Sequence, residues 1–108
     1  MTREERLAKN EVLFRDVNER VREISADTWD VSERVEFLCE CVLTDCLERV
    51  MLTLRAYEEV RANPTHFVLV PGHERLDLEF VVASGDGYVV VEKNDATKPL
   101  VTRQDPRS

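Results

Sequence analysis

Three cysteines lie between Cys39 and Cys46 in the pattern Cys-x-Cys-x4-Cys, and the chain has no others. The cytosol keeps thiols reduced, and an odd number of cysteines leaves one without a disulfide partner. A free cysteine is often a small buried apolar side chain, but the clustering of all three argues against that interpretation. Thiolates are preferred ligands of Zn²⁺, which usually takes four nitrogen or sulfur donors in a tetrahedron. The pattern therefore predicts a metal site that needs one more donor.

The fourth donor is predicted to be His73, in the segment Pro71-Gly72-His73-Glu74. This segment directly follows a predicted strand, where a Pro-Gly turn can aim an imidazole sideways at a neighbouring hairpin. Other residues with suitable ligand atoms are His66, Asp45, Glu40 and Glu74. Carboxylates are less common beside three thiolates, and a lone histidine at the start of a strand, as His66 is, is usually half-buried or exposed. The predicted ligands of Zn²⁺ are therefore Cys39, Cys41, Cys46 and His73.

Three thiolates and one imidazole fill a tetrahedral shell, whereas hydrolytic zinc generally keeps one position open for water or substrate. The predicted role of the metal is therefore structural. Zinc binding by small peptides is worth about 10–16 kcal/mol, which is large for so short a chain. An iron–sulfur cluster is the weaker interpretation, because such clusters are mostly held by four cysteines in other spacings.

A long amphipathic helix is predicted over residues 3–25. Thr2 and Glu5 have the spacing of a capping box, which marks its start. One side of the helix carries a stripe at seven-residue spacing: Leu7, Phe14, Val21, Asn10, Val17 and Ile24. Two arrangements bury such a stripe. The helix packs on its own domain, or residues 3–25 form a short homodimeric coiled coil in which a buried Asn10 sets the register.

The rest of the chain is predicted to be mostly antiparallel β-structure, so the fold class is α+β. A turn follows the first helix, and Trp29 after it is expected to anchor that helix by packing. The period-two pattern and turn residues predict strands at Val35–Cys41, Leu47–Leu52, Phe67–Val70, Leu76–Ala83 and Tyr88–Val91, with a hairpin turn at Ser84-Gly85-Asp86-Gly87 between the last two. One short helix is predicted from Leu54 to Ala62, with Thr53 as its cap. The predicted organisation is an N-terminal helix in 1–26, a zinc-stapled domain in 27–94 and a loose tail in 95–108.

Composition narrows the classes of function. The chain has 22 acidic and 15 basic residues, a net charge of −7 and 43% apolar residues, which suits one globular domain. Its acidic pI of about 4.8 opposes nonspecific binding to phosphate backbones. No apolar run approaches the ~20 residues that a membrane-spanning helix needs, and the charged amino terminus does not resemble a secretion signal. We therefore expect a cytoplasmic protein without membrane contact.

No enzyme is expected, because the sequence lacks a phosphate-binding loop, a dinucleotide fingerprint and a nucleophile elbow. The favoured prediction is a protein-interaction or regulatory module. Its partner stays open between the transcription machinery, a sigma or anti-sigma type factor and a second copy of the chain, which the sequence does not rank. The alternative is a nucleic-acid-binding zinc-knuckle protein, although the six-residue spacing of Arg49, Arg55 and Arg61 scatters their charges around a helix. A thiol-based redox or metal sensor ranks lower, since thiolate reactivity depends on exposure.

Several motifs occur in a fixed order: Phe37-Leu38-Cys39-Glu40-Cys41, then Cys46, Tyr57-Glu58 with Val60-Arg61, Pro71-Gly72-His73-Glu74, and Val90-Val91-Glu92-Lys93. This order resembles small actinobacterial proteins of unassigned function, over about residues 10–93. The resemblance implies a cytosolic bacterial protein and carries no mechanism.

Overall fold

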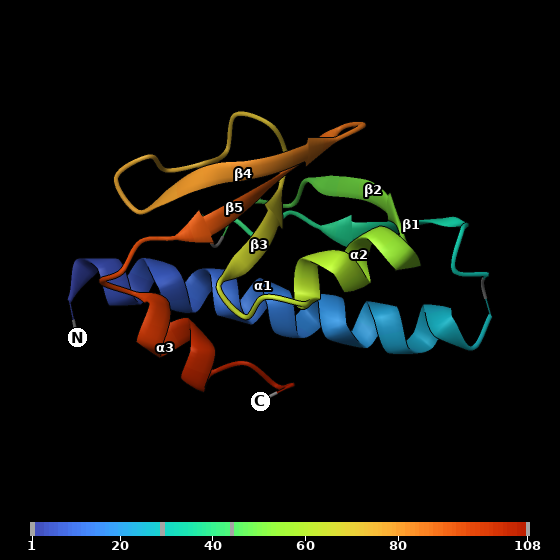
Figure 1. Ribbon diagram of the computed structural model, residues 1–108, viewed down its shortest axis with the longest axis horizontal. Coiled ribbons are helices and arrows are strands. Elements are labelled where there is room, and N and C mark those ends of the chain that lie inside the picture. The colour runs from blue at the N-terminus through green and yellow to red at the C-terminus, as the bar shows by residue number, and fades with distance from the viewer. Residues whose placement is uncertain (1, 29, 44, 108) are drawn as a thin grey trace.

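The computed structural model describes residues 2–28, 30–43 and 45–107. The elements in chain order are α1 (Arg3–Ala26), β1 (Arg34–Leu38), β2 (Arg49–Thr53), α2 (Leu54–Arg61), β3 (His66–Leu69), β4 (Glu79–Gly85), β5 (Tyr88–Lys93) and α3 (Lys98–Arg103). Figure 1 shows α1 running along the length of the molecule with both sheets on one side of it. The predicted α+β class is confirmed. The predicted packing anchor Trp29 lies outside the described residues.

Helix α1 begins as predicted, because the Thr2 side chain accepts from the Glu5 amide and Glu5 reaches back to the Thr2 amide. Its inward face differs from the prediction. Val17 and Ile24 are 41% and 70% exposed, although Phe14 is buried. The buried face instead follows the helical spacing of Ala8, Glu11, Val12, Phe14, Arg15, Asn18, Glu19 and Ser25. Polar residues can occupy this face because most of their donors and acceptors meet partners in other elements.

Strands β1 and β2 form an antiparallel hairpin whose inward side chains pair Val35 with Leu52 and Phe37 with Val50. Phe37 stacks on Tyr57 of α2 with ring centroids 4.3 Å apart. The predicted first strand extends to Cys41, but β1 ends at Leu38. The chain leaves the hairpin there because the Glu40 amide donates to the Val68 carbonyl, 2.8 Å away on β3.

The second sheet has the antiparallel order β3-β5-β4, so β5 is its central strand. Residues Leu76–Leu78, predicted as the start of a strand, form a turn before β4. The predicted hairpin turn between β4 and β5 is present, and Gly87 takes the positive φ of 86° that glycine tolerates best. A register shift between Val81 and Ala83 introduces a bulge in β4.

The predicted loose tail in 95–108 is wrong, because it contains α3. Leu100 and Val101 are buried in one apolar cluster with Ala8, Val12 and Phe67. The Arg15 side chain also donates to the Val101 carbonyl at 2.8 Å. The composition of this segment does not indicate a helix, because Leu100 and Val101 are its only apolar residues between Lys98 and Arg103.

None of the helices in the described part of the chain combines the length and the apolar character that crossing a membrane requires.

Candidate metal centre

Cys39 and Cys41 lie in the segment that follows β1 on the way to β2, and this segment is hydrogen-bonded to β3 of the other sheet. Successive side chains of an extended chain point to opposite sides, so both thiols share one side and Glu40 takes the other. Two backbone hydrogen bonds fix this segment. The Cys39 amide donates to the Glu48 carbonyl at 3.1 Å, and the Glu40 amide donates to the Val68 carbonyl at 2.8 Å. The Cys-x-Cys spacing therefore presents two sulfur atoms to the same site.

The Glu40 side chain points into the protein and fastens the cysteine segment to α1. Its carboxylate accepts from the Asn18 side chain at 2.8 Å and from the Val68 amide at 3.0 Å. Burial raises the pKa of Glu40 to about 7, while these two donors act in the opposite direction. Asn18 also accepts from the Leu38 amide at 2.8 Å and donates to its carbonyl at 2.9 Å. A buried helical asparagine thus sets the position of the first two cysteines.

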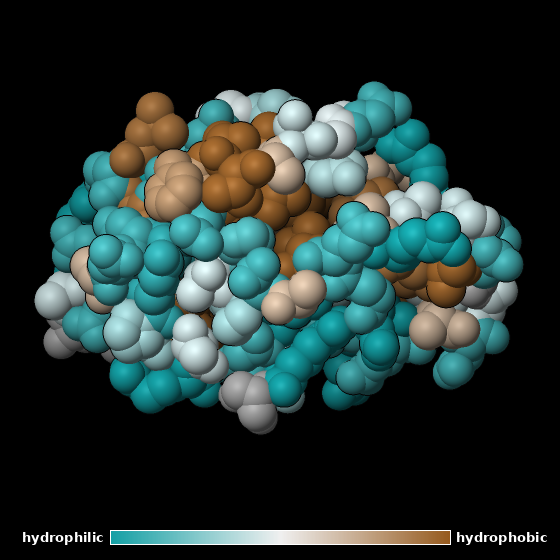
Figure 2. Space-filling view, in the orientation of Figure 1, coloured by the Kyte–Doolittle hydropathy of each residue, from teal (hydrophilic) through white to brown (hydrophobic). Residues whose placement is uncertain are grey.

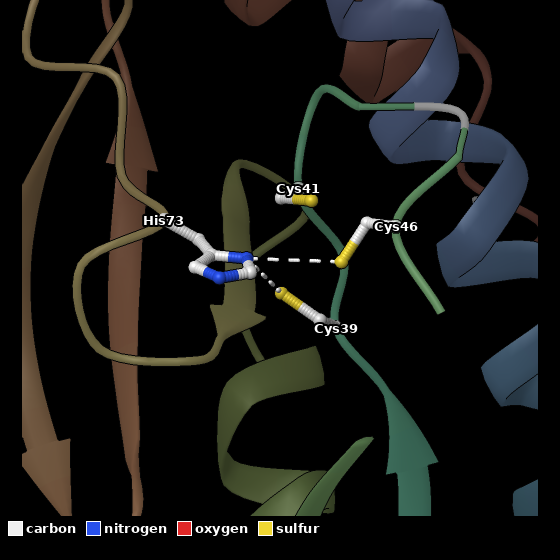
Figure 3. A group of neighbouring side chains, drawn as sticks. All are labelled: Cys39, Cys41, Cys46 and His73. Atoms are coloured by element: carbon white, nitrogen blue, oxygen red, sulfur yellow. Dashed lines mark hydrogen bonds between the residues drawn. The ribbon is translucent and has the colours of Figure 1, made fainter. Parts of the chain in front are cut away.

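Cys46 and His73 come from two turns. The Cys46 amide donates to the Leu43 carbonyl at 3.1 Å, and the His73 amide donates to the Val70 carbonyl at 3.0 Å. Gly72 in the second turn has a φ of 95°, a conformation that side chains with a Cβ rarely adopt. Figure 3 shows that the His73 imidazole, which follows this Pro-Gly turn, points toward the cysteines.

The four predicted donors converge. The His73 Nδ1 atom lies 3.6 Å from the Cys39 sulfur and 3.7 Å from the Cys46 sulfur. The three sulfur atoms and one ring nitrogen of the group all lie within 4.8 Å of one another. Cys39 and Cys41 are buried, whereas Cys46 and His73 are half-buried. The cluster therefore lies where the cysteine loop meets the Pro-Gly turn, with two donors buried and two partly exposed.

This spacing suits a tetrahedral zinc ion. With Zn–S near 2.3 Å and Zn–N near 2.0–2.1 Å, tetrahedral angles separate a sulfur from a nitrogen by about 3.6 Å. The two distances from His73 to sulfur match that value. The arrangement is thus close to what a metal requires, and the donor set is compatible with Zn²⁺.

The three thiols differ in acidity, and Cys41 is the one whose pKa its neighbours lower. The hydrogen bond from Cys39 lowers the pKa of Cys41 to about 5, and the Leu43 amide adds to this effect. The same pairing raises the pKa of Cys39, and burial raises that of Cys46. The Val70 amide donates to the Cys39 sulfur at 3.2 Å, which favours negative charge on that atom. One thiolate with two further thiols beside it is a site that attracts a soft or borderline cation.

The other residues with ligand atoms serve different contacts. His66 lies on β3, with its Nε2 atom 3.1 Å from Glu92. Glu40 faces the core, and Glu74 accepts from the Gly72 amide at 2.8 Å. Asp45 is exposed and does not join the group of four among the described residues.

Glu48 is a site residue that the sequence analysis missed. Its Oε2 atom lies 2.7 Å from the His73 Nε2 atom, on the side of the ring away from the cysteines. Because Nδ1 faces the sulfur atoms, Nε2 is left free to carry the proton and donate it to Glu48. The only signal in the sequence is an acidic residue two positions after Cys46, which is too common to single out.

Comparisons of the chain with protein-family models, with curated proteins and with solved structures gave no match. The resemblance to small actinobacterial proteins therefore stays a prediction.

Proposed function

We propose that the protein binds one structural Zn²⁺ through Cys39, Cys41, Cys46 and His73. The observation that carries this proposal is the convergence of four soft donors within 4.8 Å of one another. They come from two segments that are distant in sequence, the cysteine loop and the Pro-Gly turn. A metal held between them links the end of the β1–β2 hairpin to the loop before β4, and its binding energy adds to that of folding.

The proposed role of this zinc-stapled fold is that of a cytoplasmic protein-interaction or regulatory module rather than an enzyme. A shell with three thiolates and one imidazole has no free position for a substrate. The acidic net charge of −7 favours a protein partner over a nucleic acid. Arg61 is one of the three arginines considered for phosphate contact. It is buried in ion pairs with Glu19 and Asp105, so it is unavailable to the phosphate backbone of a nucleic acid.

The metal is tested by elemental analysis of the purified protein together with three variants, Cys41→Ser, His73→Ala and His66→Ala. We expect about one Zn²⁺ per chain in the wild type, and its loss in Cys41→Ser, because a serine hydroxyl is a poor zinc ligand. His66→Ala is the matched control: it removes the other histidine, which contacts Glu92, and should leave the zinc content unchanged. A folded wild-type protein that contains no metal would overturn the proposal, as would zinc loss in His66→Ala with zinc retained in His73→Ala.

A further inference from the structure

The two edges of the β3-β5-β4 sheet differ in how they are covered. The outer edge of β3 is covered by the cysteine segment. The Glu40 amide donates to the Val68 carbonyl, and the Val68 amide donates to the Glu40 carboxylate. Within the described residues, by contrast, no hydrogen bond joins residues 80–85 of β4 to any segment besides β5. The outer side of β4 is therefore an open row of backbone donors and acceptors.

Side chains on this open strand are apolar and exposed. Phe80, Val81 and Val82 are 48%, 43% and 42% exposed, on a strand whose residues after Glu79 are all exposed. Figure 2 shows an apolar patch in the upper part of the view, where β4 and β5 lie. Free edge strands usually carry lysine, proline or inward charges that prevent pairing. Residues 80–85 contain none of these, and the bulge after Val81 is the one such feature present.

The face of this sheet toward α2 is also hollowed beside β4. A recess of about 290 Å³ is lined by residues of α2, β3, β4 and β5, among them Ala56, Val60, Val82 and Tyr88. Because Val82, Ala83 and Ser84 of β4 form part of its lining, a strand added to β4 would lie at the rim of the recess.

The chemistry of an open strand edge selects another extended strand as its partner. Antiparallel pairing of β4 with the same strand of a second copy satisfies this requirement through one self-complementary interface. The residues brought together are the uncharged 80–85 of both copies, so no like charges meet along the strand. Two acidic residues flank this stretch: Glu79 is buried against Lys93, and Asp86, in the turn after β4, pairs with Arg34 at 3.3 Å.

We propose that β4 is a homodimerisation edge, through which two copies form one continuous sheet. The proposal deepens the interaction role suggested above by naming a second copy of the chain as the partner. It places the interface on β4, whereas the coiled coil, one of the two arrangements that the sequence leaves open for residues 3–25, would use α1. The metal and the dimer are measured separately, so failure of one is distinguishable from failure of the other.

The test is the mass of the zinc-loaded full chain by sedimentation equilibrium over a range of protein and salt concentrations. We expect the mass to approach twice that of the monomer as concentration rises. Salt should strengthen the dimer, because each copy carries a net charge of −7 and salt screens the repulsion. Val82→Lys should remove the dimer and leave the zinc content unchanged. Val17→Lys is the matched control, since Val17 on α1 is the same residue type at 41% exposure.

A wild type that stays monomeric at every concentration would overturn the proposal, and so would loss of the dimer in Val17→Lys with retention in Val82→Lys. Should Val82→Lys fail to fold, hydrogen exchange of the wild type decides. Amides of residues 80–85 should exchange more slowly at concentrations that favour the dimer, and exchange that is independent of concentration would contradict the pairing.

Discussion

Glu48 lies outside the proposed ligand set and contacts one of its members, His73. A histidine that binds a metal through one ring nitrogen commonly donates the proton of the other to a carboxylate, which fixes the ring and increases its basicity. The 2.7 Å contact between Glu48 and His73 Nε2 provides this arrangement, and the Glu48 carbonyl also accepts from the Cys39 amide. One residue thus holds the histidine with its side chain and the first cysteine with its backbone.

Removal of the Glu48 side chain should weaken zinc binding without unfolding the chain. Glu48→Ala leaves the backbone contact to Cys39 and removes only the partner of His73. We expect zinc affinity, measured by competition with a chelating dye, to fall by about 10–100-fold. Asp45→Ala is the control, because it removes one exposed carboxylate from the same loop that does not belong to the Cys39–His73 group among the described residues. An equal loss in both variants would show that loop charge, and not the contact, matters.

At the scale of elements, ion pairs fasten the C-terminal segment to α1 and α2. The Arg107 guanidinium contacts Glu19 at 3.0 Å and Glu58 at 2.9 Å, while Arg61 pairs with Glu19 and Asp105. Asp105 and Arg107 directly follow α3. Ion pairs therefore hold this segment, whereas apolar packing of Leu100 and Val101 holds α3.

The ion pair between Glu58 and Arg107 should make the free energy of unfolding depend on pH. Arg107, with help from Arg22, lowers the pKa of Glu58 from 4.5 to about 2. Because the pKa is lower in the folded protein, the stabilisation is present above about pH 4.5 and is lost as the pH falls toward 2. Arg107→Ala should therefore lower the free energy of unfolding at pH 7 by about 1 kcal/mol, since Glu58 is partly exposed, and by less at pH 3.

Denaturant unfolding at the two pH values measures this difference. Arg103→Ala is the control, because Arg103 is exposed on α3 and makes no ion pair within the described residues. If Arg107→Ala lost the same free energy at pH 3 as at pH 7, the Glu58 pairing would not be the source of the effect.

For the whole molecule, α1 contacts both apolar clusters, as β3 and β5 also do. Ala8 and Val12 belong to the cluster with Phe67 and Leu100, while Val21 packs against the cluster around Phe37 and Tyr57. Buried polar residues add a second set of contacts. Lys93 of β5 pairs with Glu11 at 2.5 Å inside the protein, where both side chains are fully buried. The helix is therefore part of the core and not a separate arm.

Deletion of residues 1–24 should abolish the cooperative fold. Val12 and Phe14 alone contribute about 1.5–3 kcal/mol each through burial, against a typical total stability of about 5–15 kcal/mol. Thermal unfolding followed by circular dichroism, with zinc present, measures the outcome. Ile24→Ala, on the exposed face, should change stability by less than about 0.5 kcal/mol. A truncated chain that melts cooperatively near the wild-type temperature would show that α1 is dispensable.

Local chemistry in the sequence was enough to predict the features that depend on neighbouring residues. The capping box at Thr2, the cap of α2 at Thr53 and the turn around Gly87 are all present, because each rests on contacts a few residues apart. The grouping of Cys39, Cys41 and Cys46 with His73 was also predictable, since few other residues carry soft donors.

Tertiary structure decided the features that depend on distant partners. The stripe on α1 was misassigned because Arg15 and Asn18, polar in sequence, are buried against carbonyls and a carboxylate from other elements. Likewise, β1 ends at Leu38 because β3 offers a hydrogen bond to Glu40, and α3 forms because Leu100 meets an apolar surface supplied by α1 and β3. Periodicity detects apolar burial, whereas satisfied polar burial appears only when the partner elements are in place.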